Sequence, residues 1–313
     1  MWPFLLACAD PTIHPQDAVL RWNDAVAKGT HNSYHVQSDG VTMEELAYTH
    51  APLEVQLDEQ GVRHFELDID RADGVTFRVR HIAVIDEGSH CPTLAECLTT
   101  IDAWSAAHPG HGPIMALLEV KEVIDAEEAS AWLDALDQVV LSSVAQERLL
   151  TPDRVQGDAA DLQAAIERGW PTLGEVRGKV MIVLYDRALR DAYTRGETSL
   201  AGRPMFPMSE GEASRWSAFD VLDDPTDAAI ATQASAGRMI RSRADGWPDP
   251  DPEGGAAAIA SGAHWVSTDF PVPSNGVDYE LQLGGEGAYL CNPITAPASC
   301  TSLDLEDPER LVR

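Results

Sequence analysis

The segment 63–70 constrains the fold strongly, because polar and apolar residues alternate along it from His64 to Asp70. In an extended strand, successive side chains point to opposite faces, so Phe65, Leu67 and Ile69 share one face. The other face carries His64, Glu66, Asp68 and Asp70. Polar groups are costly to bury without partners, so this second face must line a site that supplies them.

Residues 114–121 predict a second strand, which is apolar and buried until the chain reaches Glu119 and Lys121. Charged residues at the C-terminal end of a buried strand occur where α/β barrels carry their chemistry. A length of 313 residues fits one such barrel with insertions better than two equal domains. The sequence therefore predicts one α/β barrel with a site at its strand ends.

The carboxylates of Glu66 and Asp68 share a strand face and repel each other. A shared proton, a cationic side chain or a bound metal each relieves such repulsion. Together with Glu119 and the amide of Asn32, they form an all-oxygen donor set, which favours a hard cation. Calcium accepts such a loose shell, whereas magnesium demands stricter geometry. Zinc fits less well, since no cysteine or paired histidine stands at ligand spacing.

Alternating strand and helix patterns continue along the chain. Further strands are predicted at 25–30, 180–185, 237–243 and 265–269. Helices are predicted at 52–60, 125–144, 158–168, 226–236 and 254–261, and from the capping-box pair Thr93 and Glu96 as far as Pro109. Residues 186–225 show no clear period and are expected to form loops over the barrel mouth.

The five cysteines indicate export from the cytoplasm. Cys91 and Cys97 flank the start of a helix, and Cys291 and Cys300 lie in a tail rich in proline and threonine, so two local disulfides are expected. Cys8 ends Leu5-Leu6-Ala7-Cys8, which resembles the lipobox of bacterial lipoproteins. Only seven residues precede it, whereas a secretory signal needs a longer apolar stretch. The protein is expected to be secreted or lipid-anchored as a bacterial lipoprotein.

Several stretches of the chain resemble one enzyme family. They are Gly29-Thr30-His31-Asn32-Ser33-Tyr34, residues 61–69, the region of His81, Leu118-Glu119-Val120-Lys121, and residues 91–98, 241–245 and 261–269. Together they look like the catalytic, X-domain-like part of phosphatidylinositol-specific phospholipase C, and most closely its bacterial calcium-dependent branch. The resemblance covers roughly residues 22–272 and rests on many points rather than on one motif.

This resemblance implies a distorted TIM-type α/β barrel with long loops. It places an acid–base pair at His31 and His81 and calcium ligands at Asn32, Glu66, Asp68 and Glu119. In the family's reaction, the inositol 2-hydroxyl attacks the adjacent phosphorus, which releases diacylglycerol and leaves a cyclic inositol phosphate. One imidazole must accept a proton from the hydroxyl while the other donates one to the leaving oxygen, and either order fits the two histidines. The remaining histidines are expected to be structural or solvated.

Three more side chains are expected to contact the substrate. Lys121 shares a strand face with Glu119, where its ammonium can meet a phosphate oxygen or pair with a carboxylate. Arg243 shares a strand face with Arg241, and arginine suits phosphates and sugar hydroxyls. Asp269 ends a late strand, where it can orient a histidine or a hydroxyl.

The chain is strongly acidic, with 51 acidic and 22 basic side chains and a formal net charge of −29. This charge excludes nucleic acid as a partner, because phosphate binding needs a basic footprint. It also opposes docking on anionic membranes. A phospholipid-cleaving enzyme with this surface must make peripheral contact through a neutral or apolar rim or through calcium bridging, or it must act on a soluble inositol phosphodiester.

The expected organisation has three parts: an export or lipobox-like segment and linker (1–20), a phospholipase C-like barrel (21–272) and a disulfide-held capping tail (273–313). Two other classes remain open. Glycerophosphodiester phosphodiesterases share the barrel, the Glu-x-Asp pair and a second histidine, but Arg-Gly typically follows their first histidine. Here Asn32 and Ser33 follow it, and an Asn side chain offers a metal-binding oxygen, whereas an Arg side chain offers none. A non-catalytic surface binding protein is disfavoured by the intact histidines and carboxylates.

Overall fold

Eight parallel strands form a barrel within the described residues, which are 14–209 and 214–311 of the computed structural model. They are β1 (Ala25–Thr30), β2 (Val62–Asp73), β4 (Ile114–Val120), β6 (Val180–Tyr185), β7 (Phe206–Pro207), β8 (Phe219–Val221), β9 (Met239–Arg243) and β10 (Trp265–Thr268). The sheet runs from β1 through β2, β4 and β6 to β7, and in the other direction through β10 and β9 to β8. A parallel bridge between Met208 and Phe219 joins these two ends. The predicted distorted TIM-type barrel is confirmed.

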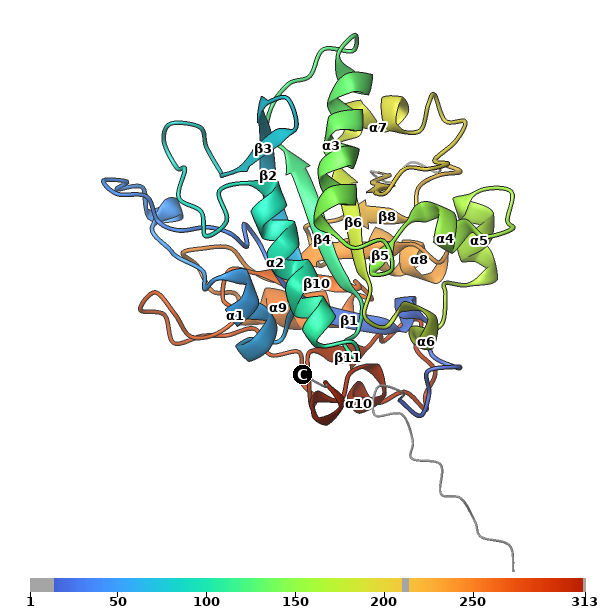
Figure 1. Cartoon of the computed structure of the whole chain (residues 1–313). Coiled ribbons are helices and arrows are strands. Elements are labelled where there is room, and N and C mark those ends of the chain that lie inside the picture. The colour runs from blue at the N-terminus through green and yellow to red at the C-terminus, as the bar shows by residue number, and fades with distance from the viewer. Residues whose placement is uncertain (1–13, 210–213, 312–313) are drawn as a thin grey trace, which may run out of the picture.

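Three further strands extend the sheet. β3 (Thr76–Val79) pairs antiparallel with β2, β5 (Leu149–Leu150) pairs parallel with β6, and β11 (Tyr289–Cys291) pairs antiparallel with β1. β2 is long enough to continue past its pairing with β4 and turn back into β3. The β2–β3 hairpin therefore stands at the C-terminal end of β4 (Figure 1).

Helices surround the sheet on its outside (Figure 1). They are α1 (Leu53–Glu59), α2 (Leu94–Ala107), α3 (Ala129–Ser143), α4 (Pro152–Gln156), α5 (Leu162–Arg168), α6 (Leu173–Val176), α7 (Arg187–Tyr193), α8 (Ala229–Ser235), α9 (Pro252–Ala260) and α10 (Ser302–Leu305). Short 3-10 helices lie at Trp22–Asp24, Glu44–Leu46 and Pro308–Arg310. α2 and α3 pack side by side along the outer face of the barrel (Figure 1).

Capping residues explain where the helices begin. α2 starts directly after Thr93, whose hydroxyl accepts a hydrogen bond from the Glu96 N–H while the Glu96 carboxylate accepts one from the Thr93 N–H. α3 starts at Ala129, later than the predicted residue 125. The residues before Ala129 form a turn closed by a hydrogen bond from the Ala129 N–H to the Asp125 carbonyl, and this turn precedes the helix proper.

The prediction of loops throughout residues 186–225 is wrong. This region contains α7, β7 and β8, and both strands belong to the barrel. The Asp186 carboxylate caps α7 by accepting a hydrogen bond from the Leu189 N–H. β7 and β8 are too short to show a period of two, so their sequences carry no strand pattern.

Aromatic side chains fill the N-terminal half of the barrel. Trp265 and Phe219 begin β10 and β8, and their ring centroids lie 5.5 Å apart. Trp170 packs on Phe219 at 5.5 Å, and Trp22 packs on Trp265 at 6.0 Å. All four side chains are buried. This end of the barrel is therefore a packed core, and the polar strand residues gather at the other end.

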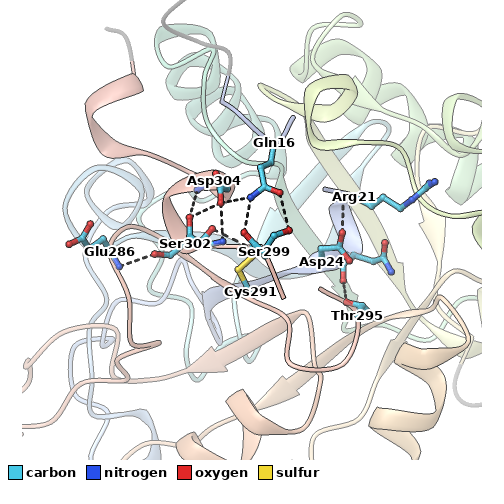
Figure 2. The surroundings of a disulfide bond; sticks show 12 residues. Gln16, Arg21, Asp24, Glu286, Cys291, Thr295, Ser299, Ser302 and Asp304 are labelled. Carbon is cyan, nitrogen blue, oxygen red and sulfur yellow. Dashed lines mark hydrogen bonds between the residues drawn. A yellow bond between two sulfur atoms is a disulfide. The ribbon is translucent and has the colours of Figure 1, made fainter. Parts of the chain in front are cut away.

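The last part of the chain is attached to the N-terminal side of the barrel. β11 pairs with β1, and the Cys291–Cys300 disulfide closes the loop that follows (Figure 2). Gln16 Nε2 donates to the Ser299 carbonyl at 2.7 Å and to Asp304 Oδ2 at 2.9 Å, as Figure 2 shows. The second predicted disulfide, Cys91–Cys97, is also present.

Cys8 lies outside the described residues, so the lipobox resemblance stays a prediction. Within the part of the chain that the structure describes, no helix combines the length and apolar character needed to span a membrane.

Candidate active site

Neighbouring strands bring His31, Asn32 and Glu66 to the same end of the barrel. The His31 N–H, just after β1, donates to the Thr268 carbonyl of β10 at 3.2 Å. The Ser33 N–H donates to the Glu66 carbonyl of β2 at 3.0 Å, and Ser33 Oγ accepts from the Glu66 N–H at 2.9 Å. Asn32 takes a left-handed conformation in this turn, with φ of 46°, which asparagine adopts more readily than most residues.

Glu66, Asp68 and Glu119 form an acidic cluster at this end. The parallel register pairs Asp68 of β2 with Glu119 of β4, and Glu66 shares the strand face of Asp68. One oxygen from each carboxylate lies within 4.8 Å of the other two. Glu66 and Asp68 are buried, whereas Glu119 is part-exposed. The structure thus brings together the three carboxylates that the sequence predicts as metal ligands.

Two cations contact this cluster. Arg241 projects from β9 across the barrel interior and forms ion pairs with Glu66 and Asp223. The Lys121 ammonium lies 3.0 Å from Asp68 Oδ2 and 2.8 Å from Glu119 Oε1. The three clustered carboxylates therefore face two cations, one of which is shared with Asp223, and excess negative charge remains.

Burial and crowding shift the pKa values of the two β2 carboxyls in opposite directions. Burial alone would raise the pKa of Glu66, but the Arg241 guanidinium and the His31 imidazole outweigh it and lower this pKa. Burial raises the pKa of Asp68; Lys121 opposes the rise, and the charges of Glu119 and Glu66 add to it. A further cation beside Asp68 would relieve this strain on its charged form.

The donor set fits calcium. Asn32 Oδ1 is buried and has no hydrogen-bond partner among the described residues, while Asn32 Nδ2 donates to the Tyr48 hydroxyl at 3.4 Å. A buried carbonyl oxygen without a partner is costly, and a cation at the neighbouring cluster would satisfy it. Calcium takes carboxylate and amide oxygens as ligands, so it suits this combination better than softer metals.

A buried carboxylate holds His31. His31 Nδ1 lies 3.0 Å from Asp269 Oδ1, and His31 Nε2 lies 3.9 Å from Glu66 Oε1. β1 pairs with β10 so that Thr30 is opposite Thr268, which makes the residues that follow them neighbours. Burial alone would lower the pKa of His31, but the charges of Asp269 and Glu66 outweigh it and raise this pKa.

His81 has a similar arrangement in another loop. It follows β3, and its Nδ1 lies 3.2 Å from Oδ2 of the buried Asp86. Burial lowers the pKa of His81; the hydrogen bond with Asp86 opposes this, and the charges of Lys121 and His31 add to it. A pocket of about 530 Å³ opens beside His81 and Lys121. The two histidine side chains are 21% and 24% exposed, so both can be reached from outside.

The predicted substrate contacts take different positions. The Lys121 ammonium forms ion pairs with two carboxylates of the acidic cluster. Arg243 Nη2 lies 3.3 Å from His31 Nδ1 and 3.4 Å from Asp269 Oδ2, and 28% of the Arg243 side chain is exposed. Asp269 is only 2% exposed, so its position suits orienting His31 rather than touching a substrate.

Two residues of the site carry little signal in the sequence. Arg241 shares a strand face with Arg243, and that face is the sole sign that it points into the barrel. Asp86 is one of 51 acidic residues, and its spacing from His81 does not set it apart. Their contacts appear only once the barrel closes and the loop after β3 folds back.

Fold and site together define a TIM-type barrel with an acidic, cation-suited centre and two carboxylate-held histidines at one mouth. Residues 70–293, well over half of the chain, match the model of the family described as phosphoinositide phospholipase C, Ca2+-dependent. The protein therefore belongs to this enzyme family, in agreement with the sequence resemblance.

Solved bacterial structures share the fold. The calcium-dependent phosphoinositol-specific phospholipase C from a Gram-negative Pseudomonas species, in its apo form, aligns with a TM-score of 0.65 at 22% identity, over 90% of this chain and 99% of that one. Its myo-inositol complex aligns with the same values. The Ca2+-dependent enzyme from Streptomyces antibioticus aligns with a TM-score of 0.61 at 20% identity, over 81% and 96% of the two chains. No curated protein matches the sequence.

The family match begins at residue 70, after His31, Asn32, Glu66 and Asp68. The likeness to the solved structures concerns the fold alone. The roles of the individual site residues therefore belong to the proposal that follows.

Proposed function

We propose that the protein cleaves phosphatidylinositol, or a related inositol phosphodiester, in a calcium-dependent phospholipase C reaction. The observation that carries this proposal is the convergence of an all-oxygen donor set and two carboxylate-held histidines at one barrel mouth. Membership of the phosphoinositide phospholipase C family supports the substrate class.

In the proposed reaction, the inositol 2-hydroxyl oxygen bonds to the adjacent phosphorus while the bond from phosphorus to the diacylglycerol oxygen breaks. The products are a cyclic inositol phosphate and diacylglycerol. His31 and His81 act as the acid–base pair: one Nε2 accepts the hydroxyl proton, and the other donates a proton to the leaving oxygen. Asp269 and Asp86 occupy the Nδ1 atoms, which leaves each Nε2 for the substrate.

Asn32, Glu66, Asp68 and Glu119 would hold the calcium ion. When bound, calcium supplies positive charge that stabilises the phosphoryl oxygens as negative charge develops on them. Arg243 and Lys121 are part-exposed cations beside this centre, and we assign them to the phosphate and the inositol hydroxyls. Asp269 acts on the substrate indirectly, by holding His31.

Phosphorus NMR of the products from phosphatidylinositol tests the proposal. A cyclic inositol phosphate should appear with calcium and should disappear when a chelator is added. Glycerol phosphate from a deacylated lipid would instead indicate a glycerophosphodiester phosphodiesterase. Binding of inositol lipid without turnover, in calcium, would indicate a non-catalytic surface protein.

We further propose that an apolar rim brings the mouth to the bilayer despite the net charge of −29. The rim consists of exposed apolar residues in the loops after β1, β2, β3 and β4: Met43, Val75, Val84, Ile85 and Val123. Val84 and Val123 are 90% and 98% exposed. These loops lie at the end of the barrel that carries the site. Apolar side chains gain free energy on entering a bilayer without any charge attraction, so a zwitterionic surface suffices.

Vesicle sedimentation tests this rim. Val84→Ser combined with Val123→Ser should weaken binding to phosphatidylcholine vesicles by at least about tenfold, because each buried valine contributes about 1.5 kcal/mol or more. Val19→Ser is the matched control, since Val19 is also exposed but precedes β1 at the other end of the barrel. Turnover of a soluble inositol phosphodiester should stay the same in the double variant and in the control variant. Unchanged vesicle binding of the double variant would exclude the rim.

The two disulfides suit an oxidising compartment, and we propose that the protein is exported. Cell fractionation checks this: the wild type should be found outside the cytoplasm. If Cys8 carries a lipid anchor, Cys8→Ser should move the protein from the membrane fraction to the medium. Retention of the wild type in the cytoplasm would contradict export.

A further inference from the structure

Asp86 is a fully buried carboxylate that two histidines share. Asp86 Oδ2 lies 2.8 Å from His35 Nε2 and 3.2 Å from His81 Nδ1. The Ser38 hydroxyl donates to Asp86 Oδ1 at 3.2 Å. Asp86 and His35 are 0% exposed, whereas His81 is 24% exposed and opens to the pocket. The group is therefore buried at one end and open to the substrate side at the other.

The loop after β3 is folded so that Asp86 returns beneath His81. The Ile82 N–H donates to the Asp86 carbonyl at 3.0 Å, and the Asp86 N–H donates to the Ile82 carbonyl at 2.8 Å. Val84 takes a left-handed conformation, with φ of 70°, at the tip of this closed loop. Both backbone bonds fix the carboxylate relative to the imidazole of the same loop.

A second segment, residues 34–36, forms backbone hydrogen bonds with the residues that follow this loop. The Val36 N–H donates to the Gly88 carbonyl at 3.1 Å, and the His90 N–H donates to the Tyr34 carbonyl at 2.9 Å. His35 lies between these bonds, and its ring stacks on Tyr48 with the centroids 4.2 Å apart. This segment follows directly after Asn32 and Ser33 in the chain. The loop that supplies His31 and Asn32 therefore also supplies the donor that holds Asp86.

The contact with Asp86 defines which atom of His81 is free. A carboxylate at Nδ1 keeps a proton on that nitrogen, so Nε2 alone is left to exchange a proton with a substrate. It also fixes the plane of the ring. Loss of a carboxylate in this position lets the other tautomer and other ring orientations compete, and in a serine-protease triad this costs about four orders of magnitude in kcat.

We propose that Asp86 is the positioning residue of His81 and that His35 is the buried donor that fixes Asp86. This inference rests on the proposed acid–base role of His81. It assigns a function to His35, which the sequence alone suggests is structural or solvated.

Asp58 and His108 offer a comparison within the same protein. His108 Nε2 lies 3.6 Å from Asp58 Oδ1 at the outer surface, between α1 and the end of α2, and Asp58 is 36% exposed. This pair has the same residue types but lies away from the barrel mouth. Asp58→Asn is therefore a matched control for Asp86→Asn.

The decisive experiment is a double-mutant cycle on a soluble inositol phosphodiester. Asp86→Asn should lower kcat by about a hundredfold or more and change KM by less than about threefold, because the substrate contacts stay in place. In the His81→Ala background, Asp86→Asn should cause less than about a threefold further loss, because its target is gone. Asp58→Asn should leave kcat within about twofold of the wild type in either background.

Each outcome separates this inference from the proposed function. If Asp86→Asn keeps kcat within threefold of the wild type, or lowers it equally in both backgrounds, the positioning role is overturned. If His81→Ala itself keeps normal turnover, the acid–base role fails instead. Calcium binding measured by titration calorimetry should be unchanged in Asp86→Asn, and a loss of calcium binding would also overturn the inference.

His35→Phe keeps the inference testable if Asp86→Asn does not fold. Phenylalanine preserves the ring that stacks on Tyr48 but removes the donor to Asp86. Asp86 in its own loop, Lys121 after β4, and His31 and His35 after β1 lie near His81. Further charged residues line the same pocket: Asp70, Arg71, Arg78, Arg80 and Glu122. Without the His35 donor, the Asp86 carboxylate should interact more strongly with the protonated His81 ring, which raises the pKa of His81. The pH–rate profile has one limb that disappears in His81→Ala, and in His35→Phe this limb should move to higher pH. An unchanged limb would contradict the assignment of His35.

Discussion

In the proposed reaction, His31 and His81 offer the same atom, Nε2, to the substrate, since a carboxylate lies against Nδ1 of each ring. We expect His31→Ala and His81→Ala each to lower kcat by about two to four orders of magnitude, because each variant loses one proton transfer. Both side chains are part-exposed, so urea unfolding should change little. Product formation followed by phosphorus NMR measures the loss, and a near-normal rate in either variant would contradict the pair.

A substrate with an aryl leaving group separates the two roles. An aryl oxide departs without a proton, so the variant that lacks the acid should recover most of its lost rate. The variant that lacks the base should stay slow. Recovery of both variants, or of neither, would show that the two histidines do not divide the acid and base steps between them.

The Lys121 ammonium contacts the carboxylates of Asp68 and Glu119, which we propose as calcium ligands, so on that proposal it competes with the ion. We expect Lys121→Gln to bind calcium roughly tenfold more tightly, because unit charges at this distance interact by about 1–4 kcal/mol. The same variant should be less stable in chelator, where the carboxylates lose their counter-charge. Calorimetric calcium titration and urea unfolding measure these two effects. Lys179→Gln is the control, since Lys179 donates to the Glu147 carbonyl away from the site. Equal calcium affinities in the wild type, Lys121→Gln and Lys179→Gln would contradict this prediction.

The loop after β3 depends on a close backbone approach at Gly88. A Cβ built on Gly88 would lie 1.8 Å from the Val36 carbonyl oxygen, so a side chain here must push apart the two segments that hold Asp86. We expect Gly88→Ala to cost about 1–3 kcal/mol of stability and to lower kcat, because overpacking shifts the backbone that carries Asp86. Urea unfolding and steady-state kinetics on a soluble substrate measure both effects.

A glycine at the tip of the β2–β3 hairpin provides the control for this element. A Cβ on Gly74 would meet nothing within 4 Å, and its φ of 43° is one that asparagine tolerates. Gly74→Asn should therefore leave stability and kcat nearly unchanged. A similar loss in both variants would show that Gly88 is not special, and that the close approach to Val36 is not what places the loop.

The sequence predicted elements with strong local patterns and missed those that depend on the closed barrel. β1 and β6 both have the predicted bounds. β6 is a continuous apolar run of the kind that a buried strand requires, whereas β1 is apolar only in its first three residues. β7 and β8 were missed because their few residues show no period and form strands only between their neighbours in the ring. Local pattern therefore suffices for long strands but not for the short ones that close the barrel.

The site residues also fall into two groups: those that a local sequence pattern predicts and those that only the folded barrel reveals. The carboxylates of Glu66 and Asp68 could be placed together from the period of two along one strand. The contacts of Asp86 and Arg241 could not, because they join loops and strands that are distant in sequence and meet only in the folded barrel. The sequence therefore gives the candidate ligands, whereas the groups that hold and neutralise them require the structure.

At the scale of the whole molecule, a buried ion pair ties the end of the chain to the barrel. Glu306 accepts hydrogen bonds from Arg63 Nε at 3.0 Å, from Arg63 Nη2 at 2.6 Å and from the Gly112 N–H at 2.7 Å. Glu306→Gln would leave the Arg63 charge buried without its counter-charge, so stability should fall by about 3–5 kcal/mol in urea unfolding. Glu309→Gln, at an exposed position nearby, should change stability by less than about 0.5 kcal/mol.

Acid should remove the same stabilisation. Burial alone would raise the pKa of Glu306, but the Arg63 charge and hydrogen bonds outweigh it and hold this pKa below its ordinary value of 4.5. A lowered folded-state pKa means that the pair stabilises the fold fully above about pH 4.5 and loses this effect as the pH falls through the folded-state value. The stability difference between the wild type and Glu306→Gln should therefore be constant from pH 7 to pH 5 and shrink at pH 4 and below. A difference that stays constant into acid would mean that the effect of Glu306 on stability does not depend on its charge.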